Sequence, residues 1–210
     1  MQAPLVNIVL LSKENGQEYD CDIERSAVCY KVVSGDEFTV KVEIERPKKD
    51  KFTTYVVECL VDGTTLGYQF QISPEHMHVA IFDGLKANHK DGRKRQSLKF
   101  ANLDVVGNLY SCNTEFGKII VNVFEGGDKV PAERPSSKTK RFVPGNNKVN
   151  EKSGKFFDTQ RLHATAGSSF TTTESITNEY AIERKHLLTS TSVIYDDKEY
   201  VNMRKRARIH

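Results

Sequence analysis

Two histidines and a group of carboxylates are the residues whose types and spacing could hold a metal ion. His76 and His78 stand one residue apart, so on a strand both imidazoles would point to the same side, as in a His-x-His metal pair. The sequence places no third ligand, and a surface pair is therefore the better interpretation. Asp196 and Asp197 stand beside Glu199, but a solvated acidic turn explains this segment more simply than a cation site does. We therefore expect no metal site and no cofactor.

The sequence contains none of the short motifs that mark common enzyme sites. It has no Gly-x-Ser-x-Gly nucleophile elbow, no His-Glu-x-x-His zinc motif and no phosphate-binding loop. Its four cysteines, at positions 21, 29, 59 and 112, do not form the close pairs of a zinc site. We therefore predict that the protein is not an enzyme and has no catalytic residues.

Clusters of lysine and arginine are the sequence feature that stands above background. One falls in an expected loop, one in a polar linker and one near the C-terminal end. Nuclear import receptors bind such runs, and such runs also neutralise the phosphates of nucleic acid. The alternative is ordinary solubilising charge on flexible segments. The candidate interaction or nuclear-import residues are Arg93, Lys94, Arg95, Lys138, Lys140, Arg141, Arg204, Lys205, Arg206 and Arg208.

The formal net charge of +3 is distributed unevenly along the 210 residues. Residues 1–127 hold 15 Lys and Arg against 18 Asp and Glu, a net charge of −3. Residues 128–210 hold 16 against 10, a net charge of +6. The apolar run Leu5–Leu11 has no basic residue before it, which argues against a signal peptide, and no run approaches the ~20 residues that span a bilayer. We predict a nuclear or cytoplasmic protein that is not secreted and has no membrane partner.

Alternating side chains predict the strands that position these residues. The clearest stretch is a hairpin between Phe52 and Ile72, whose Asp62-Gly63 turn supplies the positive φ of a tight hairpin. Two strands alone are marginal in water, so we expect this hairpin at the centre of a larger sheet. The apolar residues that share a face in its two arms are Tyr55, Val57, Cys59 and Val61, and then Leu66, Tyr68, Phe70 and Ile72.

Further strands complete a β-rich domain over residues 1–127. We expect an all-β fold, an antiparallel two-sheet sandwich of about eight strands, because a sandwich buries one face of every alternating strand. Residues 85–97 are polar and basic and are expected to form a long loop or a disordered insertion. The other predicted strands cover residues 5–11, 18–23, 27–33, 38–44, 77–82, 98–106 and 117–124.

The composition changes at residue 128. Residues 128–150 contain three prolines and few apolar side chains, so they cannot bury enough surface to offset the entropy of ordering. We expect residues 128–210 to form a polar, basic C-terminal tail that is largely extended or disordered. A short helix is predicted over residues 175–188, because Ile176, Tyr180 and Leu187 line one helical face.

Several short motifs resemble a domain of unknown function that is abundant in fungi. Ser34-Gly35-Asp36-Glu37-Phe38-Thr39-Val40 is similar to its Gly-x-x-Phe-x-Val pattern, and Leu60-Val61-Asp62-Gly63 to its strand-Asp-Gly turn. Leu98-Lys99-Phe100 and Gly117-Lys118-Ile119-Ile120-Val121 resemble its closing strands, with a leucine in place of the first phenylalanine. The resemblance covers about residues 26–125 and implies a β-rich fold without implying an activity.

Three functions are consistent with these features. The first is a non-enzymatic protein-interaction module whose basic tail contacts an unidentified protein partner. The second is a nuclear, nucleic-acid-associated protein that binds phosphates or another polyanion through the tail. The third is a structural subunit, cellular or viral, whose tail threads across its neighbours.

Overall fold

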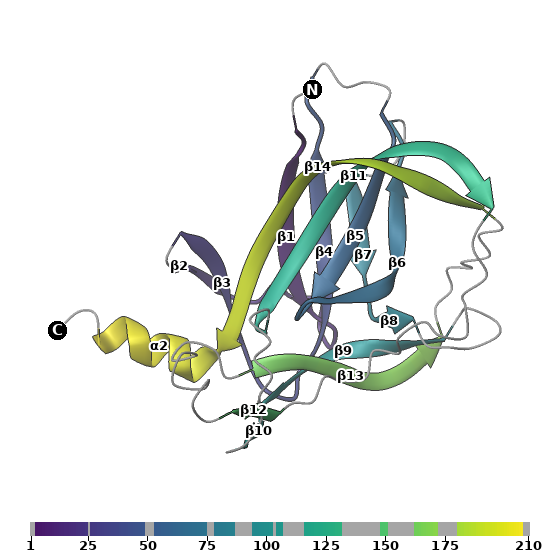
Figure 1. Cartoon of the computed structure of the whole chain (residues 1–210). Coiled ribbons are helices and arrows are strands. Elements are labelled where there is room, and N and C mark those ends of the chain that lie inside the picture. Colours follow the sequence, from purple (N-terminus) through teal and green to yellow (C-terminus); the bar gives the residue numbers. More distant parts are fainter. Residues whose placement is uncertain are drawn as a thin grey trace.

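The described part of the protein folds as a sandwich of two β-sheets, with a short helix near the C-terminal end (Figure 1). The computed structural model describes residues 3–24, 26–48, 53–74, 78–86, 94–102, 104–106, 116–131, 148–150, 162–171 and 180–207. The architecture confirms the predicted all-β, antiparallel two-sheet fold.

The first sheet runs in the order β1-β4-β9-β13, with β7 beside β4 and β8 beside β9. All of its pairs are antiparallel. Every second residue of β4 faces the core, and these side chains are at most 2% exposed, as the alternation predicts. The strands are β1 (Leu5–Ser12), β4 (Glu37–Glu45), β7 (Val79–Phe82), β8 (Leu85–Lys86), β9 (Lys94–Asn102) and β13 (Leu162–Thr171).

The second sheet runs in the order β2-β3-β14-β11-β5-β6. The β3–β14 pair is parallel, and the other pairs are antiparallel. The hairpin predicted at the centre of its sheet is β5–β6, and it lies at one side, because β6 is the last strand. The strands are β2 (Cys21–Glu24), β3 (Ala27–Val32), β5 (Tyr55–Val61), β6 (Thr64–Ile72), β11 (Lys118–Pro131) and β14 (Tyr180–Asp197).

Strand β14 comes from the segment that the sequence predicts to be a tail outside the domain. It lies between β3 and β11 and pairs with both, and β13 pairs with β9 in the first sheet. The tail is extended, as predicted, but residues 162–171 and 180–197 are strands of the sandwich. The predicted domain boundary at residue 127 is therefore wrong for these two segments.

The predicted helix over residues 175–188 is wrong from residue 180 onward, because β14 begins there; residues 172–179 lie outside the described part of the chain. The helix instead is α2 (Lys198–Ala207), directly after β14. Two short strands, β10 (Asp104–Val106) and β12 (Lys148–Asn150), pair in parallel. No helix within the described ranges is both long and apolar enough to cross a membrane.

The core shows why β14 belongs to the domain. Its Tyr195 is 0% exposed, and its ring centroid lies 5.0 Å from that of Phe100 on β9. Phe100 stacks in turn on Phe38 of β4, with ring centroids 3.9 Å apart. Cys59 is fully buried, as its place in the hairpin predicts. Aromatic side chains from both sheets therefore meet in one core, and β14 supplies one of the largest.

Candidate functional site

Helix α2 begins with a well-formed N-cap. The Asp197 carboxylate accepts hydrogen bonds from the backbone N–H groups of Glu199, at 2.9 Å, and Tyr200, at 3.2 Å. Glu199 lies in the first turn, and Arg204, Lys205 and Arg206 follow near the other end. Acidic residues at the start and basic residues at the end of a helix both interact favourably with its dipole. The sequence therefore begins a helix at this point and places its cations at the outer end.

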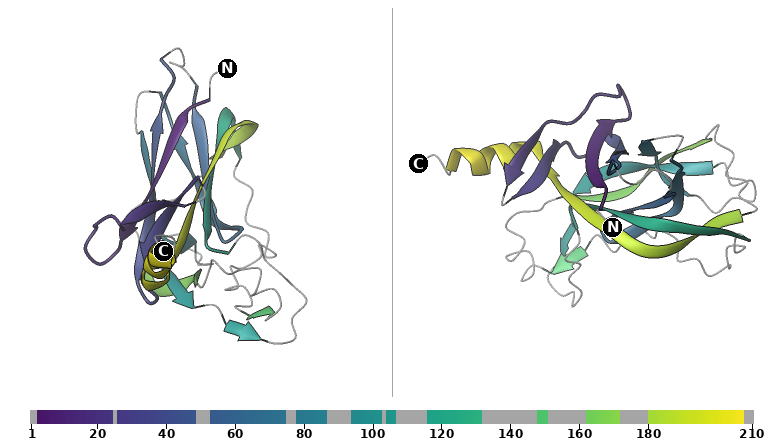
Figure 2. Two further views of the ribbon diagram at one scale, coloured as in Figure 1. Left: turned by 90° about the vertical axis from the view of Figure 1, so that its left-hand side faces the viewer. Right: turned by 90° about the horizontal axis from the view of Figure 1, so that it is seen from above.

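Only part of α2 is packed against the body. Val201 is 0% exposed, whereas Met203, two residues further on, is 62% exposed. The helix contacts β14 and β3 and then extends away from both sheets (Figures 1 and 2). A helix of ten residues is marginal in water without such packing. Because two residues of a helix are about 200° apart around its axis, Val201 lies on the packed face of α2 and Met203 on the exposed face. Arg204, Lys205 and Arg206 follow in the sequence of the last turns.

The structure separates the predicted basic candidates. Arg204, Lys205 and Arg206 belong to α2, and Lys94 is the first residue of β9. Arg95 follows in the same strand, in a segment predicted to be a loop. The remaining candidates lie outside the described residues: Arg93, Lys138, Lys140, Arg141 and Arg208.

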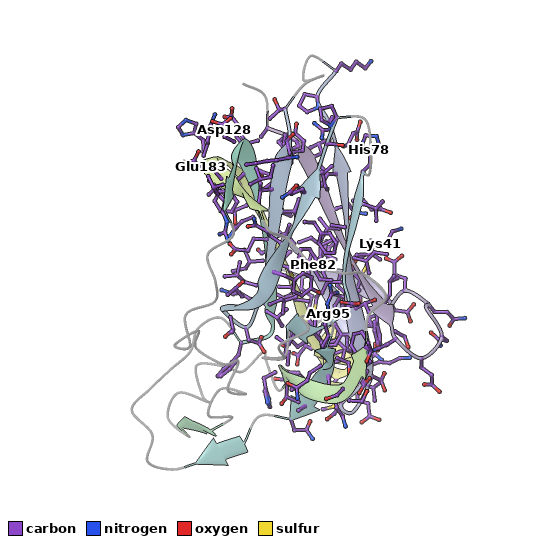
Figure 3. All side chains as sticks on the ribbon, turned by 90° about the vertical axis from the view of Figure 1, so that its right-hand side faces the viewer. Lys41, His78, Phe82, Arg95, Asp128 and Glu183 are labelled. Carbon is purple, nitrogen blue, oxygen red and sulfur yellow. The ribbon has the colours of Figure 1, made fainter. Side chains whose placement is uncertain are left out.

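Arg95 corrects the prediction of an exposed basic cluster. Its side chain is 1% exposed and forms an ion pair with Asp83. Its guanidinium carbon lies 4.3 Å from the ring centroid of Tyr68, whose hydroxyl donates a hydrogen bond to Asp83 at 3.1 Å. Figure 3 shows Arg95 among packed side chains near Phe82. Because the guanidinium is enclosed, Arg95 stabilises the fold and does not face a partner.

A second polar group was missed by sequence reasoning and lies at the Asp62-Gly63 turn. Both turn residues have positive φ, 52° for Asp62 and 75° for Gly63, as the hairpin requires. The Asp62 carboxylate is 4% exposed and accepts the backbone N–H of Gly117 on one oxygen, at 2.7 Å. Its other oxygen accepts the N–H of Ala164, at 2.6 Å. The Tyr195 hydroxyl lies 2.8 Å from both oxygens.

One carboxylate therefore joins four segments: the β5–β6 turn, the residue before β11, and strands β13 and β14. Burial raises the pKa of Asp62 to about 7, against the hydrogen bonds from Ala164, Tyr195 and Gly117, which lower it. Burial also raises the pKa of Tyr195, and the charge of Asp62 adds to this effect. Both carboxylate oxygens of Asp62 accept hydrogen bonds from groups of the protein, so Asp62 has a structural role.

The suggested metal ligands do not form a site in the described part of the chain. Within those residues, no group of three or more His, Cys, Asp or Glu is placed to hold a metal ion. His78 is exposed, and His76 lies outside the described residues. Asp196, predicted to be solvated, is 1% exposed, and Asp197 is the N-cap of α2. The acidic turn therefore serves to start the helix.

Comparison of the chain with protein-family models, curated proteins and solved structures gives no significant match. The resemblance to the fungal domain of unknown function stays a prediction.

Proposed function

We propose that the protein is a non-enzymatic protein-interaction module that contacts its partner through α2. The observation that carries this proposal is the half-packed helix: Val201 is buried, Met203 is 62% exposed, and Arg204, Lys205 and Arg206 follow in the part that extends from the sandwich. An exposed apolar side chain beside several cations suits an apolar groove with an acidic rim on another protein.

A partner protein explains this surface better than nucleic acid does. A nucleic-acid-binding face usually carries basic residues in a continuous patch or stripe. The burial of Arg95 removes one expected member of such a patch. The alternative of a nuclear protein that binds phosphates through α2 rests on the same three cations and gives no role to Met203.

The end of β11 favours a second candidate, a structural subunit. β11 pairs with β5 only as far as Glu125, and beyond it β11 and β14 continue as a two-stranded ribbon (Figure 1). Val130 on this ribbon is 37% exposed, and Leu187, which pairs with Phe124 just before the ribbon begins, is 54% exposed. Such a ribbon is suited to contact a neighbouring subunit. Its charges balance, however, with Lys129, Arg184 and Lys185 against Glu125, Asp128 and Glu183.

Recovery of partners from the native cell tests the proposal. The bait is the full chain, compared with a variant in which Arg204, Lys205 and Arg206 are replaced by Ala. The matched control replaces three exposed lysines elsewhere, Lys48, Lys129 and Lys185, so that the same charge is removed. We expect a nuclease-resistant protein partner that the control variant retains and the α2 variant loses. Equal recovery by both variants would contradict the proposal, and a nuclease-sensitive partner would favour the nucleic-acid alternative.

A further inference from the structure

Among the described strands, β2 presents an open edge, at the same end of the molecule as α2. It is the last strand of its sheet and pairs with β3. β3 lies between β2 and β14, and α2 continues from β14 and packs against β3. β2 therefore flanks β3 on one side and β14 flanks it on the other, and α2 begins where the β3–β14 pair ends, so β2 and α2 lie at the same side of the molecule (Figure 1). An unpaired strand edge is a natural contact surface for another chain.

This edge is acidic, whereas α2 is basic. Glu18 and Asp20 are exposed just before β2, and Asp22 within it forms an ion pair with Lys31, with Nζ and Oδ2 2.9 Å apart. Burial raises the pKa of the Cys21 thiol, and the charges of Glu18, Asp22 and Asp20 raise it further against the opposite effect of Lys31. The two surfaces at this end of the molecule thus carry opposite charge.

Each surface also has an apolar side chain without cover. Ile23 on β2 is 82% exposed, and Met203 on α2 is 62% exposed. Together with Leu5, which is 69% exposed on β1, they are the three most exposed large apolar side chains in the described part of the chain. An apolar centre ringed by complementary charges is the usual composition of a protein–protein contact.

We propose that the partner of α2 is a second copy of this chain, paired about a two-fold axis so that each α2 lies on the other copy's β2. This inference rests on the proposed function, because it names the partner for the same helix. Met203 of each copy packs on Ile23 of the other, and the basic end of α2 lies beside Glu18 and Asp20.

A two-fold axis is expected because the acidic strand β2 and the basic helix α2 lie at the same end of each molecule. A two-fold contact uses the same surface on both copies and must be self-complementary. A surface that holds an acidic strand and a basic helix side by side meets this condition, because a two-fold rotation places each against its opposite. Direct pairing of two β2 edges is disfavoured, since it would bring the carboxylates of both copies together.

Sedimentation velocity of the full chain over a range of concentrations tests the proposal. We expect a monomer–dimer equilibrium that weakens as the salt rises to about 1 M, where the screening length falls to ~3 Å. Alkylation of Cys21, an exposed thiol two residues from Ile23, should slow as the dimer forms. A protein that is monomeric at every concentration at low salt overturns the inference.

Charge exchange identifies the surfaces. One variant carries Glu18→Lys and Asp20→Lys, and the other carries Arg204→Glu, Lys205→Glu and Arg206→Glu. Each variant alone should dimerise more than about 100-fold more weakly, because like charges then face each other across both contacts. An equimolar mixture of the two should form a heterodimer, since both contacts become complementary again. Continued self-association of either variant, or failure of the mixture to associate, contradicts the reciprocal contact.

Two further variants separate the apolar contact from misfolding. Ile23→Ser should weaken the dimer at least ~10-fold, while Leu5→Ser, at another largely exposed site, on β1, should leave it unchanged. Circular dichroism should confirm that both variants fold. Equal effects of the two variants contradict the proposed interface. If the chain is monomeric but still recovers a different protein through α2, this inference fails and the proposed function stands; if it also recovers none, both fail.

Discussion

Replacement of Asp62 by Asn tests how the fold holds its C-terminal strands. Asn keeps the shape of the side chain and tolerates the positive φ of 52° at this position. It replaces one carboxylate oxygen by an NH2 group, which cannot accept a hydrogen bond. In the protein, Gly117 N–H and Ala164 N–H donate to different oxygens of Asp62, so the amide can satisfy only one of them.

The magnitude follows from the N–H group that is left without an acceptor. A buried donor without a partner costs about 1–3 kcal/mol, so we expect Asp62→Asn to lower the free energy of unfolding by about 2 kcal/mol at pH 8, where the Asp62 carboxyl group is ionised and accepts both N–H groups. Tyr195→Phe removes a hydroxyl and leaves both backbone donors satisfied, and should cost about 1 kcal/mol. Because both residues share one carboxylate, the double variant should lose less than the sum of the two.

The effect of Asp62→Asn should depend on pH. Burial raises the pKa of Asp62 to about 7, above the ~3.9 of an unfolded chain, so the folded state binds this proton more tightly. The contribution of Asp62 to stability is therefore full below about pH 4 and is lost as the pH rises to about 7 and beyond, by at most ~4 kcal/mol. Asn does not titrate, so the difference between parent and variant should shrink as the pH rises from 5 to 8.

Urea unfolding at several pH values measures this difference. The chain has no tryptophan, so far-ultraviolet circular dichroism and tyrosine fluorescence are the signals. Because other titrating groups are common to both proteins, the difference between them isolates Asp62. A difference that is constant from pH 5 to 8, or that grows with pH, would refute this account of the buried carboxylate.

Three further outcomes follow from the fold. A chain ending at residue 127 should not fold, as judged by circular dichroism, because it lacks the strand between β3 and β11; a stable, cooperatively unfolding fragment would contradict the topology. Val57→Asp buries a charge at a 0% exposed site and should unfold the protein. Gln71→Asp, on the exposed face of β6, should change the free energy of unfolding by less than ~0.5 kcal/mol. Equal tolerance of the two changes would refute the assignment of buried and exposed faces in β5 and β6. Arg95→Ala should lower the free energy of unfolding, measured in urea, by about 3 kcal/mol, because it removes the ion-pair partner of Asp83 and the group that covers the Tyr68 ring. A loss near zero would mean that Arg95 is exposed in solution.

The strands of the first half of the chain could be predicted because each buries one face. Phe38, Val40, Val42 and Ile44 alternate with polar residues, and the structure buries all four. The β5–β6 hairpin was predicted for the same reason. Its place at one side of the sheet was not predicted, because the residues of a hairpin do not indicate which strands from distant parts of the sequence pair with it.

Strand β14 was missed because few of its side chains enter the core. Among its described side chains, only Val193, Tyr195 and Asp196 are buried, so β14 lacks the regular apolar alternation that marks the earlier strands. Thr189, Thr191, Val193, Ile194 and Tyr195 form a β-branched and aromatic run that favours a strand, and this was the available signal. Its neighbours on both sides supply the hydrogen bonds that hold it.

The candidate site was predicted in part. The cations of α2 were identified from composition, but the helix and its exposed Met203 were not, because the ten residues have no clear apolar face. Arg95 was misplaced because its cationic side chain suggested a loop, whereas in β9 it is neutralised by Asp83, from the turn between β7 and β8. The role of Asp62 depends on Ala164 and Tyr195, about a hundred residues away or more, and no local pattern reveals such a contact.

A photo-crosslinking residue at position 203, in the full chain and in its native cell, tests most directly whether α2 is the contact element. The matched control places the same residue at position 5, where the native leucine is also exposed but lies on β1. We predict a crosslinked protein species from position 203 that is absent from position 5 and is lost when Arg204, Lys205 and Arg206 are replaced by Ala. No crosslinked protein from position 203, or the same species from both positions, would contradict the role of α2.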